Sequence, residues 1–315
     1  MNETWLVTGG AGFIGSNIVD RYLADGHEVA IIDDLSTGRR SNLNPDASFH
    51  ELSITDAEAV LAVFEQEMPE VVSHHAAQMD VRRSVAEPQF DAETNIIGTL
   101  SVLEAGRRVE ARKFIFSSSG GAIYGQADVI PTPESAPLQP ISHYGASKLA
   151  GEVYFGLYGR LYGIETTVLR YANVYGPRQD PHGEAGVVAI FSQLMLAGKQ
   201  PKIFGDGTST RDYVYVSDIV EANMIALERG DGARVNLGWG EEIPVQRVFD
   251  CVRDSVGCDI EPNYVPERLG EVARISLDAS RAKEILGWEP QVALEDGIAR
   301  SVDFYRRLAA GEITR

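Results

Sequence analysis

The chain has 315 residues, of which 44% are apolar and 23% charged, and its formal net charge is −18 at neutral pH. This length and composition are those of a globular protein with one large domain or two lobes. The strong negative charge argues against binding to nucleic acid or to an anionic membrane, because both require a basic surface. The first residues lack the features of a signal peptide, and no apolar stretch approaches the roughly 20 residues that span a bilayer, so we expect no membrane segment.

Cysteine and histidine usage points to a reducing compartment and to no metal site. Cys251 and Cys258 lie seven residues apart near one predicted helix, outside any CxxC motif, as is typical of free thiols. No cluster of histidine, cysteine and aspartate has the spacing of metal ligands. The histidines at positions 74, 75 and 182 are expected to have packing or peripheral roles. The sequence therefore predicts a cytoplasmic protein without a metal.

The first strong motif is the apolar strand at residues 5–7, which runs directly into a glycine-rich turn and an amphipathic helix over 13–25. Such a turn leaves backbone N–H groups unpaired at the start of the helix, where they and the helix dipole bind a pyrophosphate. Gly9 and Gly12 allow the tight turn and a close approach of the backbone, and Gly15 lets the helix pack against the strand. We therefore expect a dinucleotide at this turn.

The end of the next strand predicts which dinucleotide binds. This strand, residues 29–33, ends in Asp33. A carboxylate there accepts hydrogen bonds from both ribose hydroxyls and repels a 2′-phosphate, which favours NAD over NADP. Arg39 and Arg40 lie close by in the sequence and leave NADP as an open alternative.

The order of elements predicts an α/β fold, a Rossmann-type doubly wound parallel sheet with a smaller C-terminal substrate-binding lobe. Residues 212–216, the helix 217–229 and the strand 233–237 are interpreted as a return to the same sheet. The predicted NAD-binding domain comprises 1–173 plus 212–238, and the substrate lobe comprises 174–211 plus 239–315. The expected strands are 29–33, 48–52, 71–74, 113–117 and 165–170, and the expected helices are 13–25, 56–67, 90–108 and 143–162.

A tyrosine and a lysine carry the predicted chemistry. Tyr144 and Lys148 are four residues apart and therefore lie on one face of the predicted helix. A nearby ammonium favours the phenolate form, so the tyrosine could act as a general base near neutral pH. The strand before this helix ends in the serines 117–119, which places hydroxyl groups at the sheet edge where the cofactor is expected.

Together these motifs resemble the extended short-chain dehydrogenase/reductases. The resemblance covers nearly the whole chain, from the first strand to about Trp288. Within this family the chain is similar to the nucleotide-sugar epimerases and dehydratases, and most similar to the UDP-glucose 4-epimerases. The motifs that carry the resemblance are the glycine turn, Asp33, residues 74–77, Asn95, 117–119 followed by 124–125, Tyr144 with Lys148, 169–177, and 205–207 with 211–214.

The resemblance implies a role for each matching position. Tyr144, Lys148 and Ser119 would be catalytic, with Ser119 bonded to the sugar 4-hydroxyl. Asn173, Arg211, Arg268 and Glu271 would bind the nucleotide part of the substrate, and Asn95 would support the active-site helix. The cofactor-binding set would be Gly9, Gly12, Phe13, Ile14, Gly15, Asp33, Ser36, Thr37, Gly38, Ile54, Ala76, Ala77, Asn95, Tyr144 and Lys148.

Two departures from the family pattern leave alternatives open. The segment from Ser119 to Tyr124 is one residue longer than is common in the family, so Ser118 or a backbone group could replace Ser119. Ser53 precedes Ile54 where the family often has an acidic residue that contacts adenine, so that polar contact is expected to be weaker or absent.

The resemblance implies reversible C4 epimerisation of a UDP-hexose, UDP-glucose or UDP-galactose, through a 4-keto intermediate with internal hydride return to the sugar. A 4-epimerase of UDP-glucuronate or of a UDP-N-acetylhexosamine is the alternative, a nucleotide-sugar dehydratase is less favoured, and a non-catalytic NAD-binding sensor is least favoured. A dehydratase would need a carboxylate after Ser119, where the sequence reads glycine, glycine and alanine at 120–122. The resemblance also implies a homodimer through the helices 90–108 and 143–162, with Leu100, Leu103, Leu157 and Leu161 as candidate contacts.

Overall fold

The computed structural model describes residues 3–181, 186–267 and 272–313. In these residues seven strands form one sheet in the order β3-β2-β1-β4-β5-β6-β11, and every neighbouring pair is parallel. The strand order reverses between β1 and β4, which places a ligand crevice beyond the carboxyl ends of these strands. The predicted doubly wound sheet is confirmed. Its strands are β1 (Thr4–Thr8), β2 (Glu28–Asp33), β3 (Ser48–Glu51), β4 (Val71–His74), β5 (Lys113–Ser119), β6 (Glu165–Tyr171) and β11 (Arg234–Leu237).

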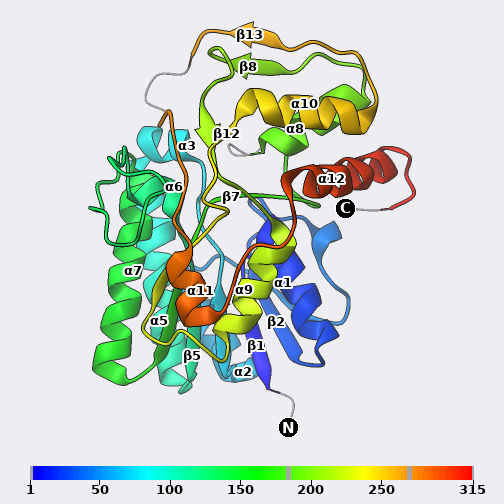
Figure 1. Ribbon diagram of the computed structural model, residues 1–315. Helices are drawn as coiled ribbons and strands as arrows, with labels where there is room; N and C mark the ends of the chain where they lie inside the picture. The colour runs from blue at the N-terminus through cyan, green and yellow to red at the C-terminus, as the bar shows by residue number, and fades with distance from the viewer. Residues whose placement is uncertain (1–2, 182–185, 268–271, 314–315) are drawn as a thin grey trace.

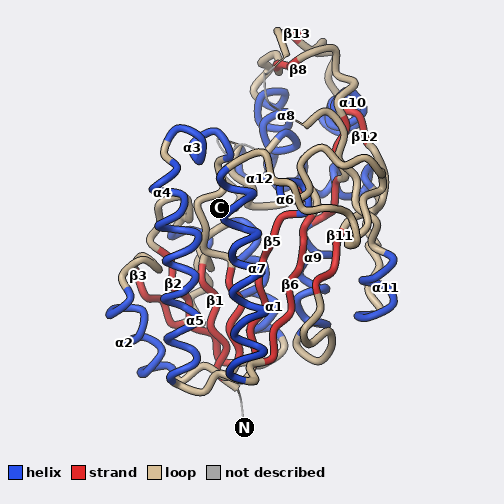
Figure 2. The backbone as a smooth tube through the Cα atoms, turned by 90° about the vertical axis from the view of Figure 1, so that its left-hand side faces the viewer, coloured by secondary structure: helices blue, strands red, loops and turns tan. Residues whose placement is uncertain are grey.

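Helices cover both faces of the sheet. Successive strand residues point to opposite faces, so Leu6 and Val7 enter two separate apolar cores. One face carries α1 (Phe13–Ala24), α9 (Val216–Ala226) and α11 (Ser280–Leu286), and the other carries α2 (Ala57–Glu67), α5 (Gly98–Arg108) and α7 (His143–Tyr162) (Figures 1 and 2). No helix in the described part of the chain is both long and apolar enough to cross a membrane.

The helix α7 has the predicted bounds, whereas the predicted helix 90–108 is interrupted. α7 begins after Ser142, whose hydroxyl accepts a hydrogen bond from the N–H of Gly145 at 3.1 Å, and ends at Gly163 with a φ of 70°. Residues 88–108 instead form α4 (Pro88–Ala92), a π-helical turn (Glu93–Ile97) and α5. Turns of this kind occur often at functional sites, and this one carries Asn95.

The prediction that residues 212–216 return to the main sheet is wrong. β10 (Tyr213–Tyr215) instead pairs with β7 (Asn173–Tyr175) in a separate two-stranded sheet. The reason is that β11 already pairs with the free edge of β6, from residue 168 to residue 171. The later strand, predicted over 233–237, does join the main sheet as expected.

Further elements lie beyond the carboxyl ends of the strands and at the sheet margins. Figure 1 shows β8, β13, α8 and α10 at the top of the molecule, away from the sheet, while α11 packs against β11 and α9. The division into an NAD-binding domain and a substrate lobe stays a prediction. These elements are α3 (Val81–Ala86), α6 (Gly120–Ile123), α8 (Val187–Leu196), α10 (Val245–Val256), α12 (Leu294–Ala309), β8 (Lys202–Phe204) with β13 (Asn263–Val265), and β9 (Thr210–Arg211) with β12 (Ile243–Pro244).

Candidate active site

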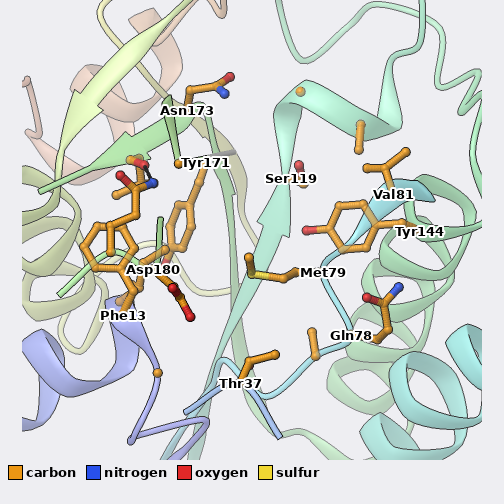
Figure 3. A pocket seen from close by; sticks show the side chains of 18 of the residues that line it. Phe13, Thr37, Gln78, Met79, Val81, Ser119, Tyr144, Tyr171, Asn173 and Asp180 are labelled. Atoms are coloured by element: carbon orange, nitrogen blue, oxygen red, sulfur yellow. Dashed lines mark hydrogen bonds between the residues drawn. The ribbon is translucent and has the colours of Figure 1, made fainter. Parts of the chain in front are cut away.

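A large cavity lies at the carboxyl ends of the sheet strands. Its volume of about 1690 Å³ exceeds the roughly 300–1,000 Å³ of a pocket for one drug-sized ligand, so it has room for two ligands together. Figure 3 shows Phe13, Tyr171 and Asp180 on one side of this cavity and Gln78 and Tyr144 on the other.

The glycine turn between β1 and α1 forms a cradle that side chains would fill. A Cβ on Gly15 would lie 2.2 Å from the carbonyl oxygen of Gly9, and a Cβ on Gly9, whose φ is +72°, would lie 2.7 Å from the nitrogen of Ala76. α1 begins after Gly12, which has no side chain to cap the helix, and residues 12–15 at this helix start all line the cavity. This geometry fits the pyrophosphate of a dinucleotide.

Asp33 is fixed at the end of β2 by backbone donors. Its carboxylate accepts hydrogen bonds from the N–H groups of Ala11 at 2.9 Å and Leu35 at 2.8 Å. Gly38 packs so closely that a Cβ there would lie 2.6 Å from Asp33 Oδ1. Burial raises the pKa of Asp33, and the backbone donors oppose that effect. The side chain lines the cavity beside the cradle, as a ribose acceptor must.

The two arginines that left NADP open each pair with a carboxylate of the protein. Arg39 forms an ion pair with Asp180 at 3.1 Å, and Arg40 forms one with Glu51. A 2′-phosphate would have to compete with these carboxylates for the guanidinium groups. The geometry therefore supports NAD.

Most of the predicted cofactor residues line the cavity, and two do not. The Asn95 amide instead lies behind the wall, where it bonds Gln78 O at 2.9 Å and Ser147 Oγ at 3.1 Å. Gly38 contributes only its close approach to Asp33. The residues that line the cavity are Gly9, Gly12, Phe13, Ile14, Gly15, Asp33, Ser36, Thr37, Ile54, Ala76, Ala77, Tyr144 and Lys148.

Tyr144 and Lys148 lie on successive turns of α7 and both line the cavity. Figure 3 shows the Tyr144 hydroxyl pointing into the cavity, with Ser119 nearby on β5. Lys148 Nζ lies 6.0 Å from the centre of the Tyr144 ring and donates a hydrogen bond to the Ser117 carbonyl at 2.8 Å. Burial lowers the pKa of Lys148 to about 8, and the charge of Asp91 opposes this effect.

The three serines at the end of β5 have different partners. Ser117 Oγ donates to the His74 carbonyl at 3.0 Å, and Ser118 Oγ donates to Glu152 at 2.6 Å. Ser119 is half-buried and shares the cavity with Tyr144 (Figure 3). The geometry therefore favours Ser119 over Ser118 as the serine that meets a substrate.

Two of the four predicted substrate residues can be placed. Asn173 and Arg211 both line the cavity. Asp212 does not neutralise Arg211, because its carboxylate accepts the backbone N–H groups of Trp239 at 2.8 Å, Gly240 and Leu277. Burial raises the pKa of Asp212 to about 6. His182, Arg268 and Glu271 lie outside the described residues.

The structure also reveals buried charges that the sequence reading missed. Glu152, one turn after Lys148 on α7, forms a two-pronged ion pair with Arg170 of β6, with donor–acceptor distances of 2.9 and 2.7 Å. A charged residue inside an apolar strand was the available signal for Arg170. Asp91 is buried on α4, in a polar stretch of sequence that gives no such signal.

The fold and cavity define a dinucleotide-dependent enzyme of the doubly wound α/β class. A sequence model of the NAD dependent epimerase/dehydratase family matches residues 5–238, and the chain belongs to this family. It is 51% identical over 309 residues to a UDP-glucose 4-epimerase of Mycolicibacterium smegmatis, and the match covers 96% of this chain and 98% of the relative.

Solved structures agree with this assignment. A UDP-glucose 4-epimerase of Thermotoga maritima, solved with UDP-glucose, is 51% identical with a TM-score of 0.95, and the match covers 97% of this chain and 99% of the other. A UDP-glucose 4-epimerase of Thermus thermophilus in complex with NAD is 43% identical with a TM-score of 0.91, covering 96% and 99% of the two chains.

Proposed function

We propose that the protein is an NAD-dependent nucleotide-sugar 4-epimerase, an isomerase that interconverts UDP-glucose and UDP-galactose. The observation that carries this proposal is one cavity that holds both a dinucleotide cradle and the Tyr144 hydroxyl, with Ser119 beside it. The substrate of the Thermotoga maritima relative and the cofactor of the Thermus thermophilus relative support it.

The residues of the cavity can hold the cofactor. The glycine cradle fits the pyrophosphate, Asp33 offers acceptors to the adenosine ribose, and Lys148 lies where it can bond the second ribose. Bound NAD would supply reversible hydride transfer at C4 of the sugar.

Tyr144 would move the proton in both directions. As a phenolate it takes the proton of the C4 hydroxyl when the 4-keto sugar forms, and as a phenol it returns that proton when the alcohol re-forms. The Lys148 ammonium favours the phenolate form by its charge. Ser119 would bond the same sugar oxygen and fix its distance from Tyr144. The proton balance closes without an external acid.

Epimerisation requires that the sugar turn while the nucleotide stays bound. Asn173 and Arg211 lie in the cavity where they can bind the diphosphate, and arginine suits bidentate contacts with phosphate. Arg268 and Glu271 stay predicted members of this set. An anchor on the diphosphate leaves the sugar ring free of contacts that would lock one orientation.

The turn after Ser119 favours an epimerase over a dehydratase. Gly121 and Ala122 line the cavity there, so this turn offers no carboxylate for a second proton transfer. A Cβ on Gly121 would meet only ordinary contacts, at 3.8 Å from Ile275 and 4.0 Å from Asn173. Because the space beside Gly121 is open, UDP-glucuronate and UDP-N-acetylhexosamines stay alternative substrates.

The experiment is to incubate the purified protein with UDP-galactose in D₂O, without added NAD, and to follow the sugar protons by NMR. We expect UDP-glucose with hydrogen retained at C4, because the hydride returns internally. Deuterium in carbon or a 4-keto-6-deoxy product would replace the proposal by dehydratase chemistry. If UDP-galactose does not react but UDP-glucuronate or an N-acetylated UDP-sugar does, that sugar replaces UDP-galactose as the proposed substrate.

We also infer a homodimer through α5, α7 and the π-helical turn. Ile97, Val153 and Leu161 are apolar and more than half exposed on these helices, at 52, 55 and 62%. Leu103, one of the residues expected at this contact, is fully buried in the core beneath α5 and cannot contribute.

Light scattering after size exclusion tests the dimer. We expect a dimer at low and high salt, and a monomer for Val153→Asp. Met68→Asp, at an exposed apolar position on the end of α2, is the control that stays dimeric. A monomeric wild type would end the inference. A cytoplasmic location stays a prediction from the sequence.

A further inference from the structure

A buried carboxylate lies behind the catalytic wall of the cavity. Asp91 of α4 is 1% exposed, and its Oδ1 accepts the side-chain amides of Gln78 at 3.0 Å and Asn95 at 3.1 Å. Its Oδ2 is buried and has no hydrogen-bond partner among the described residues. A buried polar atom without a partner carries a free-energy cost, so its retention calls for a compensating role.

Asp91 connects to α7 at the turn between the two predicted catalytic side chains. α4 and the π-helical turn pack against α7, and Figure 2 shows α4, α5 and α7 side by side on one face of the sheet. The Asn95 amide that bonds Asp91 also donates to Ser147 Oγ at 3.1 Å, and Ser147 Oγ donates to the Tyr144 carbonyl at 3.0 Å. Ser147 directly precedes Lys148 in the chain.

The groups around Lys148 identify Asp91 as its negative neighbour. At the carboxyl end of β4, burial lowers the pKa of His75 to about 3 and the pKa of His74 well below its usual value, so burial disfavours the charged form of both. On β5, Lys148 Nζ meets the Ser117 carbonyl and lies 5.0 Å from the centre of the Phe116 ring, and on α7 it faces Tyr144. Across the described part of the chain, Asp91 is the carboxylate whose charge acts on Lys148.

We propose that Asp91 is a positioning residue whose negative charge keeps the buried Lys148 side chain protonated beside Tyr144. The charge acts from behind the wall, so it does not compete with ligands in the cavity. This inference rests on the proposed function, because it explains how Lys148 stays an ammonium for Tyr144. Its test reads Lys148 directly, so it can fail independently of the epimerase assignment.

The substitution Asp91→Asn separates charge from shape. Asparagine keeps an oxygen acceptor for the amides of Gln78 and Asn95, and places its own amide where the partnerless Oδ2 stood. Only the negative charge is lost. Because an opposite charge nearby favours the charged form, its loss moves the titration of Lys148 to lower pH.

The readout is NMR of holoenzyme labelled with ¹³C at lysine Cε, titrated between pH 6 and 11. We expect the midpoint of Lys148 to fall by about one pH unit in Asp91→Asn, the lower end of the shift that a nearby charge causes. Glu87→Gln, which removes a charge at an exposed position of the same segment, is the matched control and leaves the midpoint in place. Lys148→Arg assigns the signal among the five lysines Lys113, Lys148, Lys199, Lys202 and Lys283.

Two further variants make the outcome decisive. Asp91→Glu keeps the charge and is expected to hold the midpoint near the wild-type value, whereas the neutral Asp91→Ser is expected to lower it as Asp91→Asn does. Unchanged midpoints in both neutral variants would overturn the proposal. Failure of both neutral variants to fold would also overturn it, because the carboxylate would then have a structural role.

Discussion

Two buried charges on α7 lie one turn apart and have opposite surroundings. Glu152 is 1% exposed, and its carboxylate accepts two bonds from the Arg170 guanidinium and one from Ser118. Lys148 is 6% exposed, and the described residues offer it one acceptor, the Ser117 carbonyl. An ammonium can donate three hydrogen bonds, so Lys148 is under-satisfied whereas Glu152 is fully paired.

We interpret Glu152 as a charge that stabilises the fold and Lys148 as a charge that serves the proposed chemistry. The Glu152–Arg170 pair fixes α7 against β5 and β6, and extends through Tyr124 to Asn236 of β11. Lys148 is held in a cavity wall where burial disfavours its charge, and its remaining N–H groups are available to a ligand. Perturbed charges of this second kind concentrate at functional sites. We therefore expect substitutions at the two positions to affect different properties.

The largest expected effect is on catalysis, at the chemical end of α7. Tyr144→Phe removes the proposed proton-transfer group and should lower kcat for UDP-galactose by about 10²–10⁴-fold, the usual contribution of a general acid/base. Retention of NAD and the midpoint of urea unfolding should stay close to wild type. A coupled assay measures kcat, and the absorbance of the protein-bound cofactor measures NAD retention. A variant with normal turnover would exclude Tyr144 as the base and reopen a non-catalytic role.

The next effect is on stability, at the structural end of α7. Glu152→Gln leaves the Arg170 charge buried without its partner and should reduce the free energy of unfolding by about 3–5 kcal/mol. The double variant Glu152→Met with Arg170→Met removes both charges and should recover most of that loss. Urea unfolding of the double variant and of the single variants Glu152→Met and Arg170→Met gives the coupling energy. If the double variant is as unstable as the sum of its parts, the pair is not the stabilising unit.

The sequence located the elements that depend on local signals. The helix 143–162 and the strand 71–74 were placed correctly, because apolar periodicity and terminal residues mark them. The break in the predicted helix 90–108 could not be foreseen, because the π-helical turn places Asn95 against groups distant in sequence. The pairing of β10 failed for a similar reason, since the occupancy of the β6 edge is a property of the whole sheet.

The candidate site shows the same contrast between features set by local sequence and features set by tertiary contacts. The glycine cradle and Asp33 follow from a contiguous segment, so the sequence predicted both. The partner of Arg39 lies 141 residues away, and the Ser118–Glu152 bond that leaves Ser119 to the cavity spans 34 residues. Such contacts depend on tertiary packing, which cannot be predicted from one sequence.

The pH dependence of the free energy of unfolding tests the contrast between Lys148 and Glu152. Burial lowers the pKa of Lys148 from 10.5 to about 8, so the folded state binds its proton less tightly than the unfolded state. The resulting penalty is fully present below pH 8 and disappears as the pH rises to 10.5, and it amounts to about 3 kcal/mol. Lys148→Met should therefore make the cofactor-free protein more stable at pH 7, by up to that amount, and lose this advantage near pH 10.5.

The most direct test measures unfolding and turnover on the same preparation of Lys148→Met. We expect a higher free energy of unfolding in urea at pH 7 than for the cofactor-free wild type, together with a loss of UDP-galactose turnover of about 10²-fold or more. That combination would establish Lys148 as a charge kept for chemistry at a cost in stability. A variant that is less stable than wild type and still interconverts the two sugars would contradict the account.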